Sequence, residues 1–173
     1  MTELELRNHV TKGLSDFLSV PVILHSPDAP EPSGLYLYYM DVYADNVSVE
    51  GSHIYTAIPS QNPQFDHDLR HNMVGNSDAQ YRFVVVAPAG AGAADAAQAM
   101  AEKAKSYFRY VGELPLRDIG IAVIDVSNPQ DVTVYEIDGM SRRWSFDVTF
   151  RHLRVDTRID ANIEAISVEH IKE

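Results

Sequence analysis

The stretch Arg142–Arg151, with the sequence RRWSFDVTFR, decides the fold of this chain, because apolar and polar residues alternate along it. Successive side chains of a β-strand point to opposite faces, so this stretch has one apolar face and one polar face. The apolar face consists of Trp144, Phe146, Val148 and Phe150, and the polar face consists of Arg143, Ser145, Asp147, Thr149 and Arg151. Such alternation is typical of an antiparallel strand with a core on one face and solvent or a partner on the other.

Other segments share the composition of strands, with aliphatic, β-branched or aromatic residues between turn residues. They are Val22–Leu24, Leu35–Tyr43, Val47–Ile58, Tyr81–Ala87, Ile119–Val126, Val132–Ile137 and, with ambiguous periodicity, Ile163–Val168. Leu35–Tyr43 is apolar on both faces, as expected of a strand that core or a partner subunit covers on both sides. These segments predict that Arg142–Arg151 belongs to a larger sheet.

Two segments predict helices. Leu4–Leu18 carries apolar residues at helical spacing, Thr2 is placed as its N-cap, and Pro21 ends it. Ala93–Tyr110 is rich in alanine and ends before Gly112. Helices followed mostly by strands predict an α+β fold, in which a mixed, mostly antiparallel sheet has two main helices packed on one face.

The length of 173 residues suits one domain, so residues 1–173 are expected to form a single unit. The region from about residue 44 to 79 departs from regular patterning. Within it, Pro59–Asp78 loses periodicity and accumulates Asn, Asp, His, Gln and Pro. Loops of this length are usually functional or disordered. We therefore expect a long loop or hairpin excursion at about 44–79.

The formal net charge of −11 argues against a protein that grips nucleic acid, because neutralising phosphates requires clustered Lys and Arg. An acidic wall instead lets DNA slide through a channel without being held. The chain has no cysteine, which excludes disulfides and thiolate metal sites. It also lacks an apolar run of roughly 18 residues, so no membrane span is expected.

The segment Pro88–Asp95, PAGAGAAD, follows a predicted strand and opens a predicted helix. Gly90 and Gly92 are therefore similar to the first two glycines of a dinucleotide-binding fingerprint. Asp95 stands where the third glycine is expected, and its carboxylate would face the incoming phosphate. The alternatives are a nucleotide site and a flexible turn, and the missing glycine favours the turn.

A second candidate for chemistry is the cluster of Asp66, His67, Asp68 and His71. Its histidines are four residues apart, so on a helix both imidazoles would reach one divalent ion. The surrounding sequence is loop-like, which favours solvated histidines over a metal site. The chain contains no local nucleophile motif such as GxSxG, and we expect neither catalysis nor a cofactor.

Arg143, Asp147 and Arg151 lie on the polar face of the predicted strand, and Arg154 and Arg158 follow it. A solvated strand face explains this arrangement. Charged contacts between identical subunits explain it equally well, because Arg pairs with carboxylates in bidentate fashion. Both interpretations remain open.

Tyr36 and Tyr38 lie on the predicted strand Leu35–Tyr43 without basic residues near them in sequence. Core or subunit packing therefore fits these aromatic side chains better than stacking on bases. The candidate residues of a subunit interface are Arg143, Asp147, Arg151, Arg154, Tyr36 and Tyr38.

Three segments near the C-terminus carry a family pattern: Ile119–Val126, Val132–Ile137 and Ser141–His170, the last reading SRRWSFDVTFRHLRVDTRIDANIEAISVEH. They resemble the phage neck terminator family, whose members pair a helix-preceded sheet with a late strand of R-x-x-x-x-D-x-x-F type and an IE-x-I/V ending. The matching positions are Arg142 or Arg143, Asp147, Phe150, Ile163, Glu164, Ile166 and Val168. The excursion at about 44–79 departs from the minimal pattern of the family.

The resemblance implies a structural virion protein rather than an enzyme. It implies a homo-oligomeric ring, usually a hexamer, that caps the tail tube and sheath and joins the tail to the head-connector protein. DNA would pass through the lumen without specific binding, and the ring would be assembled in the host cytoplasm without a membrane partner. The alternatives are another head–tail connector or tail completion protein, and a nucleotide-binding enzyme.

Overall fold

The chain forms two compact units in the computed structural model, which describes all residues except 27–29, 45–50, 63–64, 137–138 and 161–173. The first, here called the helix-covered unit, comprises Met1–Asn46 and Ser77–Leu153. The second, here called the hairpin unit, comprises Val47–Asn76 and Arg154–Glu173. Strands β4 (His67–Ala87) and β8 (Gly139–Asp160) contribute residues to both units.

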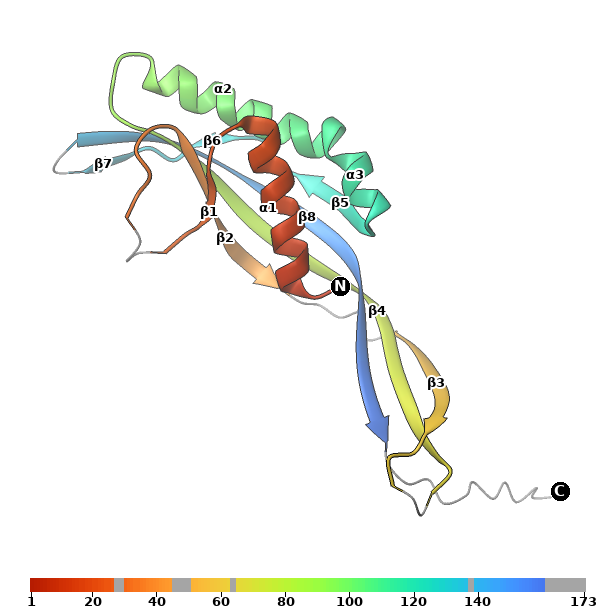
Figure 1. The fold of residues 1–173 in the computed structure, drawn as a ribbon. Coiled ribbons are helices and arrows are strands. Elements are labelled where there is room, and N and C mark those ends of the chain that lie inside the picture. Colours follow the sequence, from red (N-terminus) through yellow and green to blue (C-terminus); the bar gives the residue numbers. More distant parts are fainter. Residues whose placement is uncertain (27–29, 45–50, 63–64, 137–138, 161–173) are drawn as a thin grey trace, which may run out of the picture. The chain divides into compact units, whose positions relative to one another are not determined.

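The sheet has the order β1-β2-β4-β8-β5, with shorter strands on β8 (Figure 1). Its remaining strands in the helix-covered unit are β1 (Val22–Leu24), β2 (Tyr36–Ala44), β5 (Ile121–Val126), β6 (Gln130–Asp131) and β7 (Val134–Glu136). β1 runs parallel to β2, whereas β2 pairs antiparallel with β4, and β5 pairs antiparallel with β8. The prediction of a mixed, mostly antiparallel sheet is confirmed.

Helix α1 (Glu3–Leu18) forms where its apolar stripe and its cap predict it. Thr2 accepts a hydrogen bond from the Glu5 backbone N–H, and the Glu5 carboxylate accepts one from the Thr2 backbone N–H, which is a complete capping box. The stripe buries Leu6, Val10, Leu14 and Leu18 against the sheet. The helix ends at Ser19, in a left-handed conformation, two residues before Pro21.

The predicted helix Ala93–Tyr110 is shorter than expected and changes type near its end. α2 (Ala93–Ser106) packs small alanine side chains against the core and continues into the π-helical turn η1 (Tyr107–Val111). The N–H of Gly112 donates to the Tyr107 carbonyl at 2.7 Å, five residues back. The wider turn buries two successive aromatic residues, Tyr107 and Phe108. A short helix that the sequence did not predict follows, α3 (Glu113–Asp118).

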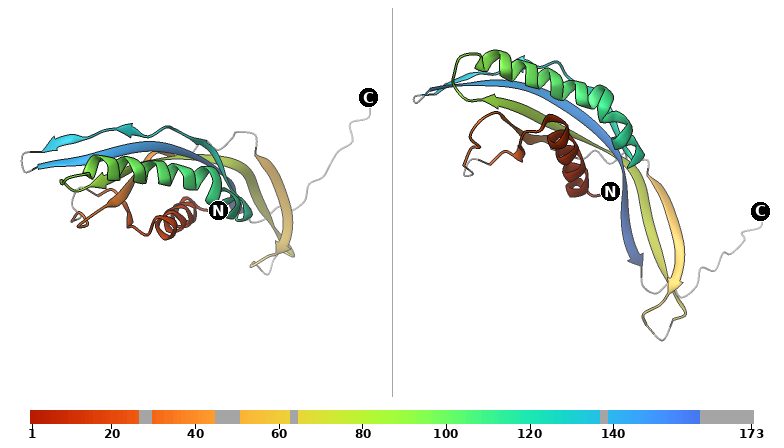
Figure 2. Two further views of the ribbon diagram at one scale, coloured as in Figure 1. Left: turned by 90° about the horizontal axis from the view of Figure 1, so that it is seen from above. Right: turned by 45° about the horizontal axis from the view of Figure 1, so that its top comes forward.

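The core lies between the sheet and the helices, which cover one face as predicted (Figure 2). Phe108 reaches down from the helical layer to Phe83 on β4 and Phe150 on β8, with ring centroids 5.3 and 5.5 Å away. Phe83 in turn stacks on Phe146 at 5.5 Å. Truncating one such buried aromatic residue to Ala typically costs about 3–5 kcal/mol. No helix in the described residues is long and apolar enough to cross a membrane.

The hairpin unit contains β3 (Ser52–Pro59), which pairs antiparallel with the first part of β4, from Ser52 opposite Val74 to Pro59 opposite His67. The interpretation of Pro59–Asp78 as loop is therefore wrong from His67 onward, where the chain is strand. The sequence pattern does not predict this strand because polar residues lie on both of its faces. Without a buried face, apolar and polar residues need not alternate. Of the predicted strand Val47–Ile58, residues 47–50 lie outside the described part of the chain, as does the whole of Ile163–Val168.

The ring of Tyr107 fills the space above two glycines, Gly13 on α1 and Gly112 after η1. An added Cβ at Gly13 would meet the Tyr107 hydroxyl oxygen, while the next ring atom is 3.4 Å away, at ordinary contact distance. A Cβ at Gly112 would instead meet three ring carbons, at 2.5 to 2.8 Å. The Tyr107 side chain thus leaves no room for a Cβ at either position. Its hydroxyl oxygen occupies the space at Gly13, and its ring carbons occupy the space at Gly112.

We expect Gly13→Ala to lower the free energy of unfolding by about 1–3 kcal/mol, as overpacking does. In the Tyr107→Phe background the clashing oxygen is gone, and Gly13→Ala should be neutral or stabilising by up to about 1 kcal/mol, the helix propensity gain. Denaturant unfolding of the four variants measures this coupling. Gly112→Ala serves as the control, since Tyr107→Phe leaves its clash in place. Equal effects of Gly13→Ala in both backgrounds would contradict the argument.

Candidate subunit interface

The sheet face opposite the helices carries a row of ion pairs between β4 and β8. Alternation along β8 turns Phe146 and Phe150 toward the core, so Asp147 and Arg151 point to the other face. Alternation along β4 does the same for Asp78 and Arg82, whose neighbours Ala79, Tyr81 and Phe83 belong to the core. The strands therefore present oppositely charged side chains to each other across one ladder.

Both ion pairs have bidentate geometry. Arg82 donates from Nε and Nη2 to the two carboxylate oxygens of Asp147, at 2.8 and 3.0 Å. Arg151 donates from the same two atoms to Asp78, at 2.7 Å each. The Arg82 and Arg151 side chains remain 45% and 46% exposed, so these guanidinium groups are ordered and still face solvent.

The ion pairs shift the pKa values of Asp78, Arg82 and Arg151 in the direction that favours their charged forms. Hydrogen bonds from Arg151 hold the pKa of Asp78 below its ordinary value, and burial opposes this effect only in part. The hydrogen bonds to Asp147 raise the pKa of Arg82, as those to Asp78 raise the pKa of Arg151. Asp78, Arg82 and Arg151 are therefore charged at neutral pH.

Tyr36 and Tyr38 lie on the same outer face as these ion pairs. Tyr36 is only 3% exposed and packs with Val84 and Val86 of β4 in a small second apolar cluster. Burial, followed by hydrogen bonding to the Glu31 carboxylate, raises the pKa of Tyr36 to about 12. Burial also raises the pKa of Tyr38, while the nearby Arg143 guanidinium opposes that shift. The structure thus brings Arg143 together with both predicted tyrosines.

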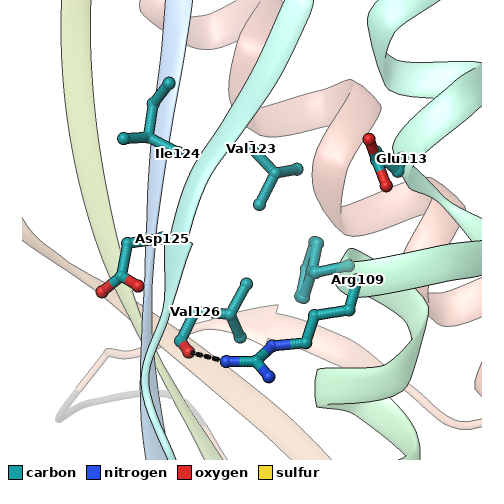
Figure 3. Close-up of a pocket in the computed structure, with 7 residues that line it drawn as sticks. Arg109, Glu113, Val123, Ile124, Asp125 and Val126 are labelled. Atoms are coloured by element: carbon teal, nitrogen blue, oxygen red, sulfur yellow. Dashed lines mark hydrogen bonds between the residues drawn. The ribbon is translucent and has the colours of Figure 1, made fainter.

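The β5 edge of the sheet borders a pocket of about 240 Å³. Phe108, Arg109 and Glu113 line it on the helical side, and Val123–Val126 line it on the strand side. Arg109 extends from η1 to the end of β5, where its Nη2 donates to the Val126 carbonyl at 2.9 Å (Figure 3). The exposed side chain of Ile124 lies on this edge.

The six predicted interface residues fall into two places. Arg143, Asp147, Arg151, Tyr36 and Tyr38 share the outer face of the helix-covered unit, whereas Arg154 belongs to the hairpin unit. Sequence reasoning missed the partners Asp78 and Arg82. The alternation of Asp78–Arg82 continues the buried strand Tyr81–Ala87 and was the available signal.

The glycines of the proposed nucleotide fingerprint lie in the turn before α2. Gly92 is the N-cap, in a left-handed conformation with φ of 80° that favours glycine. Asp95 lies in the first helical turn, where a carboxylate is stabilised by the helix dipole and opposes a bound phosphate. The structure places Gly90 and Gly92 in a turn that leads into α2.

The residues of the candidate metal cluster do not converge. His67, Asp68 and His71 lie on strand β4, so the two histidines and Asp68 point to opposite faces. Asp68 is buried and accepts hydrogen bonds from the Ser60 hydroxyl at 2.9 Å and the Gln61 N–H at 3.4 Å. His71 contacts His53, with Nε2 2.7 Å from its Nδ1. Among the described residues, no group of three potential ligands is close enough for a metal ion.

The helix-covered unit thus carries an ordered charged face and a pocket beside its β5 edge, and the candidate metal ligands do not converge in the described residues. The chain matches the profile of the phage neck terminator protein family over residues 8–173, and it belongs to that family. Comparison with individual curated proteins gives no significant match. Membership implies a structural role in the phage tail or neck, a place in the virion, and contacts with other tail or head components.

The Asp78–Arg151 pair generates a prediction about pH. The folded-state pKa of Asp78 lies below its ordinary value of 3.8, so the folded state releases its proton more readily than the unfolded state. Its stabilisation is therefore complete above about pH 4 and is lost as the pH falls through the folded-state pKa. Asp78→Asn should cost about 0.5–1 kcal/mol at pH 7, a range typical of a well-formed but half-exposed pair.

Urea unfolding at pH 7, 4 and 2.5 measures this effect. The difference between Asp78→Asn and the native chain should be largest at pH 7 and should shrink at pH 2.5. Asp118→Asn, on the exposed side of α3, is the control for removing an acidic group at pH 7. A difference that stays constant across the three pH values would contradict the assignment of the ion pair.

Proposed function

We propose that this protein forms a homohexameric ring that caps the tail tube and sheath and joins the tail to the head-connector protein. The observation that carries the proposal is the family match over residues 8–173. In this proposal the chain is a binding subunit without catalytic turnover, assembled in the host cytoplasm and retained in the virion.

Arg143, Asp147, Arg151, Arg154, Tyr36 and Tyr38 are proposed to contribute to contacts between subunits. A guanidinium group has five N–H donors, and each bidentate pair described above uses two. Arg82 and Arg151 thus hold further donors in fixed positions on a solvent-facing surface. Preordering lowers the entropy that a side chain loses when a neighbour binds it.

A closed ring needs two different complementary patches on each subunit, because each copy contacts its neighbours head to tail. The charged outer face is one candidate patch. The β5 edge is the other, since an edge strand offers backbone groups for pairing and the adjoining pocket accepts side chains. Supporting this division, the two surfaces lie at different places on the same sheet.

The acidic composition suits a lumen through which DNA passes. A net charge of −11 repels phosphates on average, so the wall of the ring would not retain DNA. We expect no retardation of duplex DNA by the protein at low ionic strength, where electrostatic binding is strongest. Salt-sensitive binding in an electrophoretic mobility assay would count against a passive channel.

Native mass spectrometry and negative-stain imaging, with and without tail tubes, test the ring. We expect hexamers in solution or on tube ends, and we expect Arg151→Ala to reduce the assembled fraction about ten-fold, as loss of a charged contact does. Arg117→Ala, which removes the same charge from α3, is the matched control and should assemble normally. A chain that stays monomeric and ignores tail tubes would contradict the proposal.

Another head–tail connector or tail completion protein is the nearest alternative within the same class. Copurification separates the two: the terminator is expected to bind tail tubes, whereas a head-completion protein is expected to bind the portal side. If the protein binds only to portal preparations, it is a head-completion protein and not a tail terminator.

A further inference from the structure

Among the described strands, none pairs with one edge of β8 in the hairpin unit, which is here called the open edge. Within the helix-covered unit, β8 pairs with β5 through His152 and lies beside β4 on its other side. In the hairpin unit, β4 still lies beside β8, and the Thr157 hydroxyl donates to the Asn72 side-chain oxygen at 2.9 Å (Figure 1). No described strand pairs with the opposite edge of β8 from Arg154 to Asp160. That edge is seven residues long and contains no proline.

The residues of this edge alternate between a charged and an apolar face. Arg154, Asp156, Arg158 and Asp160 share one face, on which Arg154 pairs with Asp156 at 3.1 Å and Arg158 pairs with Asp160 at 2.7 Å. Val155, Thr157 and Ile159 share the other face, by alternation. Val155 and Ile159 are 46% and 54% exposed, although isolated β-branched side chains on a strand are stabilised by cross-strand partners.

We propose that two copies of this chain pair antiparallel along Arg154–Asp160, about a two-fold axis at Thr157. In this register, Arg154 lies opposite Asp160 of the second copy, and Asp156 lies opposite Arg158. Every charge on this face then meets an opposite charge. On the other face, Val155 meets Ile159 and Thr157 meets its own copy, which are favourable cross-strand pairs. The occupant of the open edge is therefore the same edge of a second molecule.

The charge sequence selects this register over its neighbours. A shift by two residues in either direction places Asp156 opposite Asp156 or Arg158 opposite Arg158, and like charges directly opposite are destabilising. A shift by one residue turns the charged face of one copy toward the apolar face of the other. The exposed edge of β3, by contrast, carries no Asp, Glu, Lys or Arg from Ser52 to Pro59 and offers no charge complement.

This contact is distinct from the proposed ring. A two-fold contact uses the same patch on both copies, whereas a head-to-tail ring uses two different patches. The dimer covers an open strand edge that would otherwise be a site for unspecific aggregation. The proposed dimer can therefore be tested independently of the hexamer.

Disulfide trapping tests the register, because the native chain has no cysteine. Residues directly opposite in an antiparallel pair have Cα atoms about 4.5–5.5 Å apart, within the range that a disulfide bridges. Thr157→Cys should therefore form a covalent dimer under mild oxidation. Val155→Cys is the matched control, because its two copies would be roughly 13 Å apart along the strands, and it should not crosslink. Equal crosslinking of both variants, or none with Thr157→Cys, would overturn the proposal.

Charge exchange tests the pairing without relying on cysteine. Arg158→Asp places two carboxylates opposite each other and should weaken the dimer at least about ten-fold in sedimentation equilibrium. Combining it with Asp156→Arg restores opposite charges between copies. Within each strand, the single and the double variant each have one oppositely charged pair of neighbours among these four positions. Recovery of the dimer in the double variant thus cannot come from a gain of ion pairs inside one chain.

Arg117→Asp, with the same change in net charge on α3, controls for general repulsion and should leave the dimer unchanged. A dimer that tolerates Arg158→Asp, or one that the double variant does not restore, would overturn the proposed register. Hexamers that form normally with Arg158→Asp would separate this contact from the ring and leave the proposed function standing.

Discussion

The meeting of Phe108 with Phe83 and Phe150 is the contact on which the helix-covered unit depends, because it fixes the helical layer to the two central strands. Phe108 lies in the π-helical turn η1, which also buries its neighbour Tyr107, and from there it contacts both strands. With the core on that face, alternation sends every second residue of β4 and β8 to the opposite face. The charged row is therefore a consequence of where the aromatic core lies.

Local sequence patterns predict much of this arrangement of helices and strands. The alternation of Arg142–Arg151 predicted both faces of β8, and Thr2, placed as the N-cap, predicted the beginning of α1. The end of α2 was less predictable, because the π-helical turn depends on contacts of Tyr107 and Phe108 with residues far away in sequence. The first half of β4 was missed for a different reason. Its strand is stabilised by pairing with β3, and its side chains show no buried face that periodicity can detect.

The partners of the charged residues could not be predicted from local sequence patterns either. Alternation placed Arg143, Asp147 and Arg151 on one face, but their partners depend on which strand lies beside β8. Only the strand order brings Asp78 and Arg82 to that position. The candidate metal residues failed on the same ground, since a spacing of four suits a helix and the structure has a strand there. The residue types suggested both ion pairs and a metal site. The strand order and the strand conformation of β4 allow the ion pairs and keep the metal-site residues apart.

The order of charges on the two central strands also encodes their direction. Reading along the chain, β4 carries Asp78 before Arg82, and β8 carries Asp147 before Arg151. Antiparallel pairing matches each acid with a base, as observed, whereas a parallel arrangement would oppose acid to acid and base to base. A parallel arrangement of these two strands would bring like charges together on the sheet surface. The surface charges thus favour the observed antiparallel orientation over the reversed one.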